Sequence, residues 1–535
     1  TVLGGGYEKL KVRTKGHMGG VIGETESTLL VNHSGNSETF VGEQMNFSGL
    51  GNANEISITD TNWIETTLNA DGTIDESAVN YNRTGFLGCF GGIVGFVSGS
   101  GTTVKDVTLT NISGTLNYGY KNKTAMGGLI GRFYETDNKE YVIANCVVGS
   151  SNSTLSLKAT ANPDPGDKIM VVAGGLVGNI ECSGITKITN CSVIGDGNSI
   201  LQGTDSAAGM IGYANTYTKN GKMIYYDTCT VDGLRLRGYL RVAGVEGKRN
   251  YDIPNAYPWE VVSTFYNVQV TNCEGYVYNL NELNEVYNEA GDANEIASGG
   301  LVAYSRGRVN AVNCNISNVH LKGDDVYASG GVTGRTGGTF GSVRVANTSI
   351  TDCTLMGACV GGIAGRVDAS LGEGVTTASK INIKNNKILS YYTSEKTKYN
   401  TLHEQFAGGM YGFWKNVSYY NIMGDNVLIE NNLIGMLPIK TNTILKYNYV
   451  GGIGGLINCV VKMKTVELNN NIISILDKEA ILGAASSANV PIVDYLSSSD
   501  FGIWSLDGEG NKKVAADKVE TVYPVLFDSK NKKLY

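Results

Sequence analysis

Two pairs of aspartates come closest to a catalytic arrangement in this sequence. Asp324 and Asp325 adjoin each other, and Asp164 lies close to Asp167. A glycosidase places two carboxyl groups across a sugar bond, one as acid and the other as base or nucleophile. Both pairs stand in segments with glycine or proline that are typical of turns, where aspartate is favoured for its local hydrogen bonds. We therefore assign no catalytic residue, and both pairs stay open as candidates.

The other reactive side chains form no recognisable motif. None of the four histidines adjoins a serine or cysteine in a nucleophile motif. The ten cysteines include no C-x-x-C pair, which argues against zinc. Segments 195–199 and 507–510 lack the full spacing of a calcium loop, and the glycine-rich segment 451–455 lacks the lysine of a phosphate-binding loop. We expect no metal and no cofactor.

Composition narrows the class of protein further. The chain has 535 residues, 71 glycines but only 7 prolines, and a mild net charge of −7. Because no basic stripe is visible, we do not expect nucleic acid as a partner. No apolar run reaches the roughly 18 residues of a membrane span, so we expect no membrane insertion within this segment.

One glycine-rich phrase, which reads VGGIAGRV at 360–367, explains the glycine content. Its ten copies recur mostly at intervals of 31 to 47 residues. Between copies, apolar and polar residues alternate, which is typical of strands. Such units predict an all-β parallel β-helix of eleven to twelve rungs, with about three short strands per rung and right-handed winding. We expect the glycines at bends that need positive φ. The copies begin at Met18, Phe90, Met126, Ala173, Ala207, Ser298, Ser329, Val360, Ala407 and Val450.

A cysteine also recurs once per repeat and usually follows an asparagine. We interpret the asparagines as one column along a bend, where stacked amides bond to neighbouring rungs. We interpret the cysteines as buried free thiols. Disulfides between neighbouring turns, a reactive or metal-binding role for the cysteines, and an amide row that recognises sugar remain alternatives. The predicted ladder comprises Asn145, Asn190, Asn272, Asn313 and Asn458, with Cys146, Cys191, Cys229, Cys273, Cys314, Cys353 and Cys459.

The repeats divide the chain into five parts. An N-terminal lead-in with degenerate rungs (1–85) precedes regular rungs (86–247), an aromatic-rich rung with an insertion (248–297), further regular rungs (298–479), and a cap or the start of another module (480–535). Aromatic residues gather in the third part, and tyrosine is a common contact residue for sugars and proteins. We predict a ligand-binding patch there, with packing on the solenoid flank as the alternative. It comprises Tyr251, Tyr257, Trp259 and Tyr266.

The repeat also resembles a known family. The phrase G-G-[LIVM]-x-G, followed by segments such as VKDVTLTNISGTL (104–116) or RVNAVNCNISNVHL (308–321), is similar to the GLUG-type repeats of bacterial surface proteins. These repeats occur in large adhesins and in some immunoglobulin A peptidase-type proteins. The resemblance covers roughly residues 86–475, with a weaker copy near residue 19. It implies a parallel β-solenoid on a cell surface, and no catalytic residues.

Together, these observations predict a non-enzymatic, extracellular or cell-surface protein. It would act as an adhesin or as a rigid stalk that presents binding loops, within a longer chain or assembly. Its expected partner is a host or microbial surface glycan or protein. A polysaccharide-active β-helix, such as a lyase, a hydrolase or a phage tailspike-like depolymerase, is the first alternative and would need converging carboxylates. A structural filament subunit that assembles through its end rungs is the second.

Overall fold

The computed structural model describes most of residues 86–475 and several short segments on either side of them. The outer described segments are 5–8, 11–14, 17–25, 27, 29–31, 40–49, 505–506, 512–513, 527–528 and 533–534. Within 86–475, the segments outside the described residues are 119–122, 136–138, 162–169, 217–223, 252–261, 279–295, 324–325, 338–340, 370–375, 391–403, 417–420, 437–446, 459 and 464–465.

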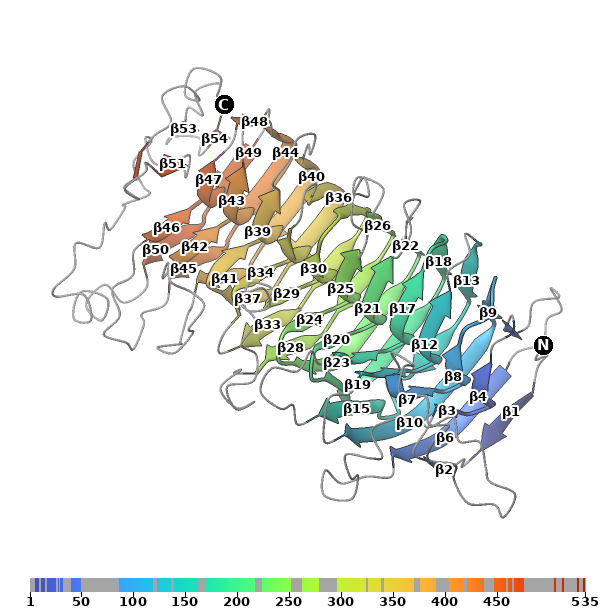
Figure 1. Ribbon diagram of the computed structural model, residues 1–535. Helices are drawn as coiled ribbons and strands as arrows, with labels where there is room; N and C mark the ends of the chain where they lie inside the picture. Colours follow the sequence, from blue (N-terminus) through green and yellow to red (C-terminus); the bar gives the residue numbers. More distant parts are fainter. Residues whose placement is uncertain are drawn as a thin grey trace, which may run out of the picture.

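Three long sheets of parallel strands run through the molecule (Figure 1). Sheet 1 has thirty strands, while sheet 2, from β3 (Met18–Gly19) to β46 (Tyr447–Gly451), and sheet 3, from β4 (Ile22–Thr25) to β47 (Gly454–Asn458), have eleven each. The described residues contain no helix, and hence none with the length and hydropathy of a membrane span. The predicted all-β parallel β-helix is confirmed. Eleven rungs spaced by about 4.8 Å make a rod of about 50 Å.

A single rung contains more strands than the three that the sequence predicts. In one rung, β20 (Ser206–Ala208) belongs to sheet 2 and β21 (Ile211–Thr216) to sheet 3, while β22 (Ile224–Asp227) and β23 (Thr230–Gly238) belong to sheet 1. Sharp bends at residues with positive φ, such as Thr228 (φ 53°), divide the sheet 1 part of the rung into straight stretches. The chain therefore changes direction at each bend, while the strands on both sides of the bend belong to sheet 1.

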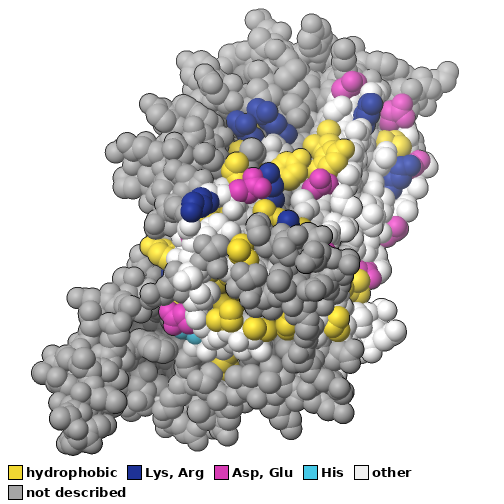
Figure 2. Space-filling model, turned by 90° about the vertical axis from the view of Figure 1, so that its right-hand side faces the viewer, with side chains coloured by type: hydrophobic (Ala, Val, Ile, Leu, Met, Phe, Trp, Pro, Cys, Tyr) yellow, Lys and Arg dark blue, Asp and Glu magenta, His cyan; other side chains and the backbone are white. Residues whose placement is uncertain are grey.

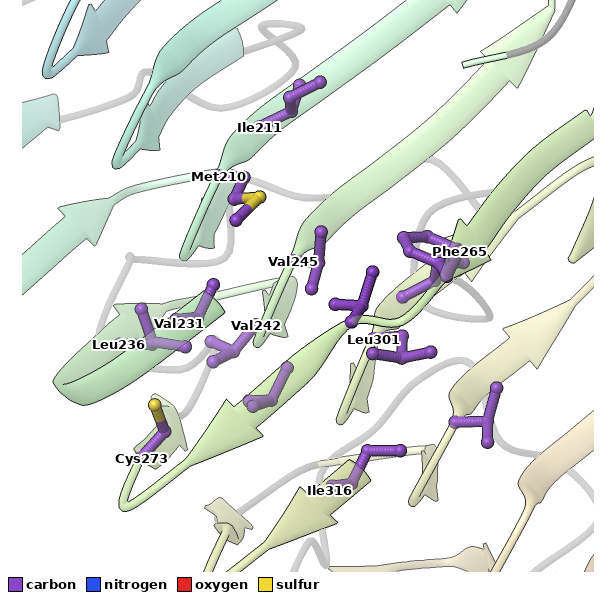
Figure 3. Packing of buried hydrophobic residues seen from close by; sticks show 14 of the residues in the cluster. Met210, Ile211, Val231, Leu236, Val242, Val245, Phe265, Cys273, Leu301 and Ile316 are labelled. Carbon is purple, nitrogen blue, oxygen red and sulfur yellow. The ribbon is translucent and has the colours of Figure 1, made fainter. Parts of the chain in front are cut away.

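The strands of sheets 2 and 3 form an arch whose tip lies in the hydrophobic core. The tip residue is the apolar residue after the second glycine of the phrase. Met210, Val245 and Leu301 hold this position in successive rungs, and none of them is exposed (Figure 3). Val231 and Leu236 of β23 pack in the same core, opposite the arch. In the unit 330–360, Val343, Val345, Thr348 and Ile350 are all buried, as their alternation predicts.

The glycines of the phrase have a different role from the one expected. Positive-φ glycines among the described residues are Gly101, Gly149, Gly197 and Gly233, and none of these belongs to a phrase. Instead, the phrase glycines lie where backbones come too close for a side chain. A Cβ at Gly127 would lie 2.0 Å from Ile130 O, one at Gly128 would lie 2.6 Å from Val148 Cγ1 of sheet 1, and one at Gly178 would lie 2.5 Å from Met126 N. The three glycines thus allow three separate close approaches.

The N-terminal part of the solenoid also differs from expectation. Met18 pairs with Phe90 and Gly19 with Gly91, so no rung lies between these two strands. The segment 54–68, expected as a degenerate rung, lies outside the described residues. The lead-in contributes β1 (Gly5–Glu8) and β2 (Lys11–Thr14), which both pair with β6 (Phe40–Gly49) in sheet 1.

At the other end, β54 (Lys533–Leu534) pairs antiparallel with β49 (Val466–Asn469). This contact places two C-terminal residues against the last rung. The role of residues 480–535 as a cap or as a further module stays a prediction.

Candidate functional site

The structure describes only two of the four predicted ligand-binding aromatics. Tyr251 ends β25 (Glu246–Tyr251) in sheet 3, whereas Tyr266 ends β26 (Val262–Tyr266) in sheet 1. Tyr257 and Trp259 lie outside the described residues. Tyr266 is 36% exposed, whereas its neighbour Phe265 is buried and stacks on Tyr226 with ring centroids 4.7 Å apart. The predicted patch therefore remains untested, with Tyr266 as its one member that is seen at the surface.

The structure does not test the candidate catalytic aspartates. Both aspartate pairs lie outside the described residues, as do His33 and His403. His17 Nδ1 accepts a hydrogen bond from Cys89 N (3.1 Å), and burial, together with Arg132, lowers the pKa of His17 to about 4. His320 Nε2 lies 3.0 Å from Asn318 Oδ1 at the surface. Among the described residues, no cluster of three or more histidine, cysteine or acidic side chains has the geometry to hold a metal.

Four of the five predicted asparagines occupy two bends rather than one. Asn145, Asn190 and Asn313 lie at the first bend of sheet 1, and Asn272 lies at the second, all with φ between 51° and 55°. The amides stack along each bend: Asn190 Nδ2 donates to Asn145 Oδ1 (2.9 Å), and at the second bend Asn318 Nδ2 donates to Asn272 Oδ1 (2.8 Å). Asn458 instead ends β47 in sheet 3, where its backbone pairs with Lys415.

Each described ladder cysteine follows a bend residue with positive φ, which is an asparagine in four cases and Thr228 or Asp352 in the other two. All nine described cysteines are buried and free, while Cys459 lies outside the described residues. Each bend thiol bonds to a carbonyl two residues earlier, and most also bond to one in the preceding rung. Cys353 Sγ, for example, lies 3.1 Å from Thr351 O and 3.7 Å from Ile316 O. The thiols therefore satisfy bend carbonyls inside the core. The ladder cysteines seen in this role are Cys146, Cys191, Cys229, Cys273, Cys314 and Cys353.

A row of aromatic and cationic side chains, which the sequence analysis missed, runs along sheet 3. It occupies the position after the last glycine of each phrase. Lys248 Nζ lies 5.5 Å from the Tyr213 ring centroid and 5.8 Å from that of Tyr304, and the Arg366 guanidinium lies 4.4 Å from that of Phe413. Such contacts are favourable cation–π interactions. The row comprises Phe96, Arg132, Asn179, Tyr213, Lys248, Tyr304, Arg335, Arg366 and Phe413.

This row is mostly buried and is paired within the protein. Arg132 bonds to Glu181 (3.2 Å), and Arg335 and Arg366 both bond to Asp368 (2.8 and 2.6 Å). The row lies over small residues of sheet 2, so that Tyr213 packs with Ala125 and Val172. We therefore assign these side chains a structural role, in which they close the arch formed by sheets 2 and 3, rather than a role in ligand binding. The residue after the last glycine of each phrase was the sequence signal that could have revealed the row.

A second group that the sequence analysis missed lies on the outer face of sheet 1. We call Arg237, Tyr239, Tyr276 and Tyr278 the tyrosine patch. Arg237 belongs to β23, and Tyr276 to β28 (Glu274–Val277) in the next rung, where the two residues are register partners. The ring centroids of Tyr276 and Tyr278 are 5.2 Å apart in an edge-to-face arrangement, and those of Tyr239 and Tyr278 are also 5.2 Å apart. All four side chains are half-buried.

The tyrosine patch is flanked by charges. The Arg237 guanidinium lies 5.8 Å from the Tyr276 ring centroid, and its Nη2 lies 3.5 Å from Glu274 Oε2. The same carboxylate lies 3.9 Å from Arg235 Nε. On the side that Figure 2 shows, by contrast, acidic, basic and hydrophobic side chains intermingle without a continuous stripe of one charge.

An alternation of residue types along two segments of the sequence accounts for the tyrosine patch. In LRLRGYL (234–240) and EGYVYN (274–279), every second residue is polar or aromatic. The burial of β23 and β28 follows the same period, because alternate strand residues point to opposite faces. The signal was therefore present in the sequence, but only the rung register places the two segments side by side.

Comparison with known proteins adds no assignment. No family model, no curated protein and no solved structure matches this chain.

Proposed function

We propose that this chain is a non-catalytic, surface-displayed or secreted β-solenoid that binds an extended ligand on its outer face. In this role it would be an adhesin, or a rigid stalk with its own binding surface. The observation that carries the proposal is the tyrosine patch, because partly exposed tyrosines beside an arginine suit contact with sugars or with protein partners. The GLUG-type resemblance of the repeats supports the same class of protein.

The rigidity of the platform supports this proposal further. Arg237 and Tyr276 project from adjacent strands whose register is fixed by parallel pairing on both sides. Groups held on strands keep their geometry better than groups on loops, so less conformational freedom is lost on binding.

The test is a binding assay that also detects cutting. The purified chain is incubated with a panel of glycans and matrix proteins, and retained ligands are sized by mass spectrometry. We expect retention of an intact ligand, and about tenfold weaker retention by the variant Y276A/Y278A, as expected when a contact worth about 1.4 kcal/mol is lost.

The variant Y225A is the matched control. Tyr225 also points outward from sheet 1 and is half-buried, but it lies on β22, before the first bend. It should bind like the parent chain. A shortened ligand would overturn the non-catalytic proposal in favour of a polysaccharide-active enzyme. Self-assembly without ligand retention would favour a filament subunit.

A further inference from the structure

Among the described residues around the tyrosine patch, the outer face of sheet 1 carries an excess of positive charge. Two register rows run side by side there. One row contains Lys158, Gln202, Arg237, Tyr276 and Lys322 in five successive rungs. The other row contains Ile200, Arg235, Glu274, His320, Thr354 and Lys387. We call the cations Lys158, Arg235, Arg237, Lys322 and Lys387 the basic strip.

The charge of this strip is opposite in sign to the net charge of the chain. The two rows hold five lysines and arginines and a single carboxylate, Glu274, in a chain whose net charge is −7. Glu274 lies between Arg235 and Arg237 and can neutralise only part of their charge. A local excess of one sign on a rigid face attracts ligands of the opposite sign.

The shape of the strip favours a linear ligand. Lys158 and Lys387, the two ends of the strip, are six rung steps apart along the solenoid axis, which corresponds to about 29 Å. Cations repeat along this axis and the tyrosine patch lies between them. A polymer with anionic groups along its length would contact both ends of the strip at once.

We infer that the basic strip and the tyrosine patch together bind a linear acidic polysaccharide that carries carboxylate or sulfate groups. The inference rests on the proposed binding function and names its ligand class. In this arrangement Arg235, Arg237 and Lys322 pair with the anionic groups, since guanidinium and ammonium groups bind such groups by charge-assisted hydrogen bonds. A sugar ring packs on the exposed face of the tyrosine patch.

The aromatic geometry favours a polysaccharide over a single-stranded nucleic acid. Nucleic acid channels offer separate ring faces on which successive bases stack. Here the three rings contact one another at 5.2 Å with interplanar angles of 38° and 66°. They therefore form one compact platform rather than a series of stacking sites.

The experiment compares four polymers in titrations with the full chain at low and at physiological salt. The probes are heparin (sulfated), polygalacturonate (carboxylated), dextran (neutral) and a single-stranded oligothymidylate. We expect at least one of the acidic polysaccharides to bind more tightly than the neutral one. We also expect its affinity to fall by about tenfold or more between 50 and 200 mM salt, because several ionic contacts are broken.

Variants locate the site. R237Q and K322Q should each weaken acidic polysaccharide binding, and the double variant by about tenfold or more, as expected for the loss of charge-assisted hydrogen bonds. K187Q is the control, since Lys187 lies on a different part of sheet 1 in an exposed ion pair with Glu140 (2.7 Å) and should be dispensable. Circular dichroism verifies that each variant is folded.

The outcomes separate the inference from the proposed function. If dextran binds as well as the acidic polymers, and Y276A/Y278A lowers binding but R237Q/K322Q does not, the binding function stands and the acidic ligand is overturned. If the oligothymidylate binds most tightly and depends on the same residues, the polysaccharide class is overturned. If none of the four polymers is bound, the inference fails, and the wider glycan and protein panel decides the proposed function.

Discussion

At the residue scale, the bend positions show how three chemically different side chains meet one requirement. At several bends the inward residue that follows donates a hydrogen bond to a carbonyl of the preceding rung or of its own rung, because such carbonyls are buried away from water. Cys353 does so toward Ile316 O, and Asn386 does so toward the next carbonyl in the same register row, Ile350 O (2.9 Å). Thr348 instead bonds to Ala346 O within its own rung (2.9 Å).

Burial should make the bend thiols unreactive in the native protein. Burial raises the pKa of Cys229 and Cys353 to about 12, and the thiolate is the species that reacts with alkylating agents. We expect iodoacetamide at pH 8 to leave all nine described cysteines unlabelled in native buffer and to label them in guanidinium chloride. Peptide mass spectrometry measures the labelling. Native labelling of Cys191 or Cys229 would contradict the packed bend.

Two buried carboxyls should give opposite dependences of stability on pH. Burial raises the pKa of Glu246, although Arg249 and hydrogen bonds from Ser263 (2.9 Å) and Tyr226 (3.1 Å) oppose the shift. The native state then holds a proton that the unfolded chain, with a pKa of about 4.3, releases. Glu246 therefore stabilises the fold fully below this pH, and its contribution falls as pH rises toward the raised pKa.

Asp368 gives the opposite dependence. Burial disfavours ionisation of its carboxyl, but Arg366 and Arg335 together lower its pKa. Its contribution is present above about pH 3.9, its unfolded pKa, and is lost as pH falls through the lowered folded pKa. Thermal melts of E246Q, D368N and the parent chain from pH 3 to pH 8 measure both effects. As the pH falls, we expect the difference in stability between the parent chain and D368N to shrink. Over the same pH range, we expect the parent chain to become more stable relative to E246Q. Parallel curves would contradict this account.

At the scale of elements, a buried ladder of amides replaces the cysteines in the last rungs. Asn432 accepts hydrogen bonds from Asn386 N and Nδ2 (both 2.9 Å) and donates to Ile383 O (2.8 Å). We expect N432L to lower the free energy of unfolding by about 3 kcal/mol or more, because several buried polar groups lose their partners. N432C should be milder, since Cys353 already serves this position two rungs earlier. Equal losses in urea titrations of the two variants would argue against the equivalence of thiol and amide.

The arch makes a separate prediction about close packing. A Cβ at Gly175 would lie 2.0 Å from Gly209 O and 2.5 Å from Val193 Cγ1. We expect G175A to destabilise the protein by about 3 kcal/mol or more, since the backbone of two rungs must move. Gly197 has φ +79° and no atom within 4 Å of its Cβ position. G197N is the control and should be nearly neutral, because asparagine tolerates this conformation. Both are compared by thermal melts.

At the scale of the whole molecule, stability is shared between rungs. Each strand of sheets 2 and 3 inside the rod pairs with one strand on each side, so a rung cannot complete its hydrogen bonds alone. We expect the fragment 206–277, which holds two rungs, to be unfolded by circular dichroism, and the fragment 86–390 to melt cooperatively. A cooperative melt of the short fragment would contradict a shared core.

The sequence alone is sufficient to predict the repeat, the parallel β-helix and the inward alternation of residues such as Val343 and Ile350. It places Asn190 and Asn272 in one ladder but does not separate the two bends, because the pattern of asparagine and cysteine is the same at both. It also leaves the partners of Arg237 and Tyr276 unknown, since they are 39 residues apart and only the register joins them. Local patterns therefore predict the strands of one rung. Which residues of neighbouring rungs lie side by side depends on how many residues separate those rungs along the chain.

The pairing of β3 with β7 (Phe86–Gly91) has a consequence for how such a protein can diversify. Met18 and Phe90 are 72 residues apart, whereas Ser298 and Ser329 are 31 apart, yet both pairs are neighbours in sheet 2. Doubling a loop adds only about 0.6 kcal/mol to its closure entropy. Mutation and recombination can therefore lengthen or exchange a loop on one rung and leave the pitch of the rod unchanged. The same property would let an engineer graft a foreign peptide between two strands without redesigning the scaffold.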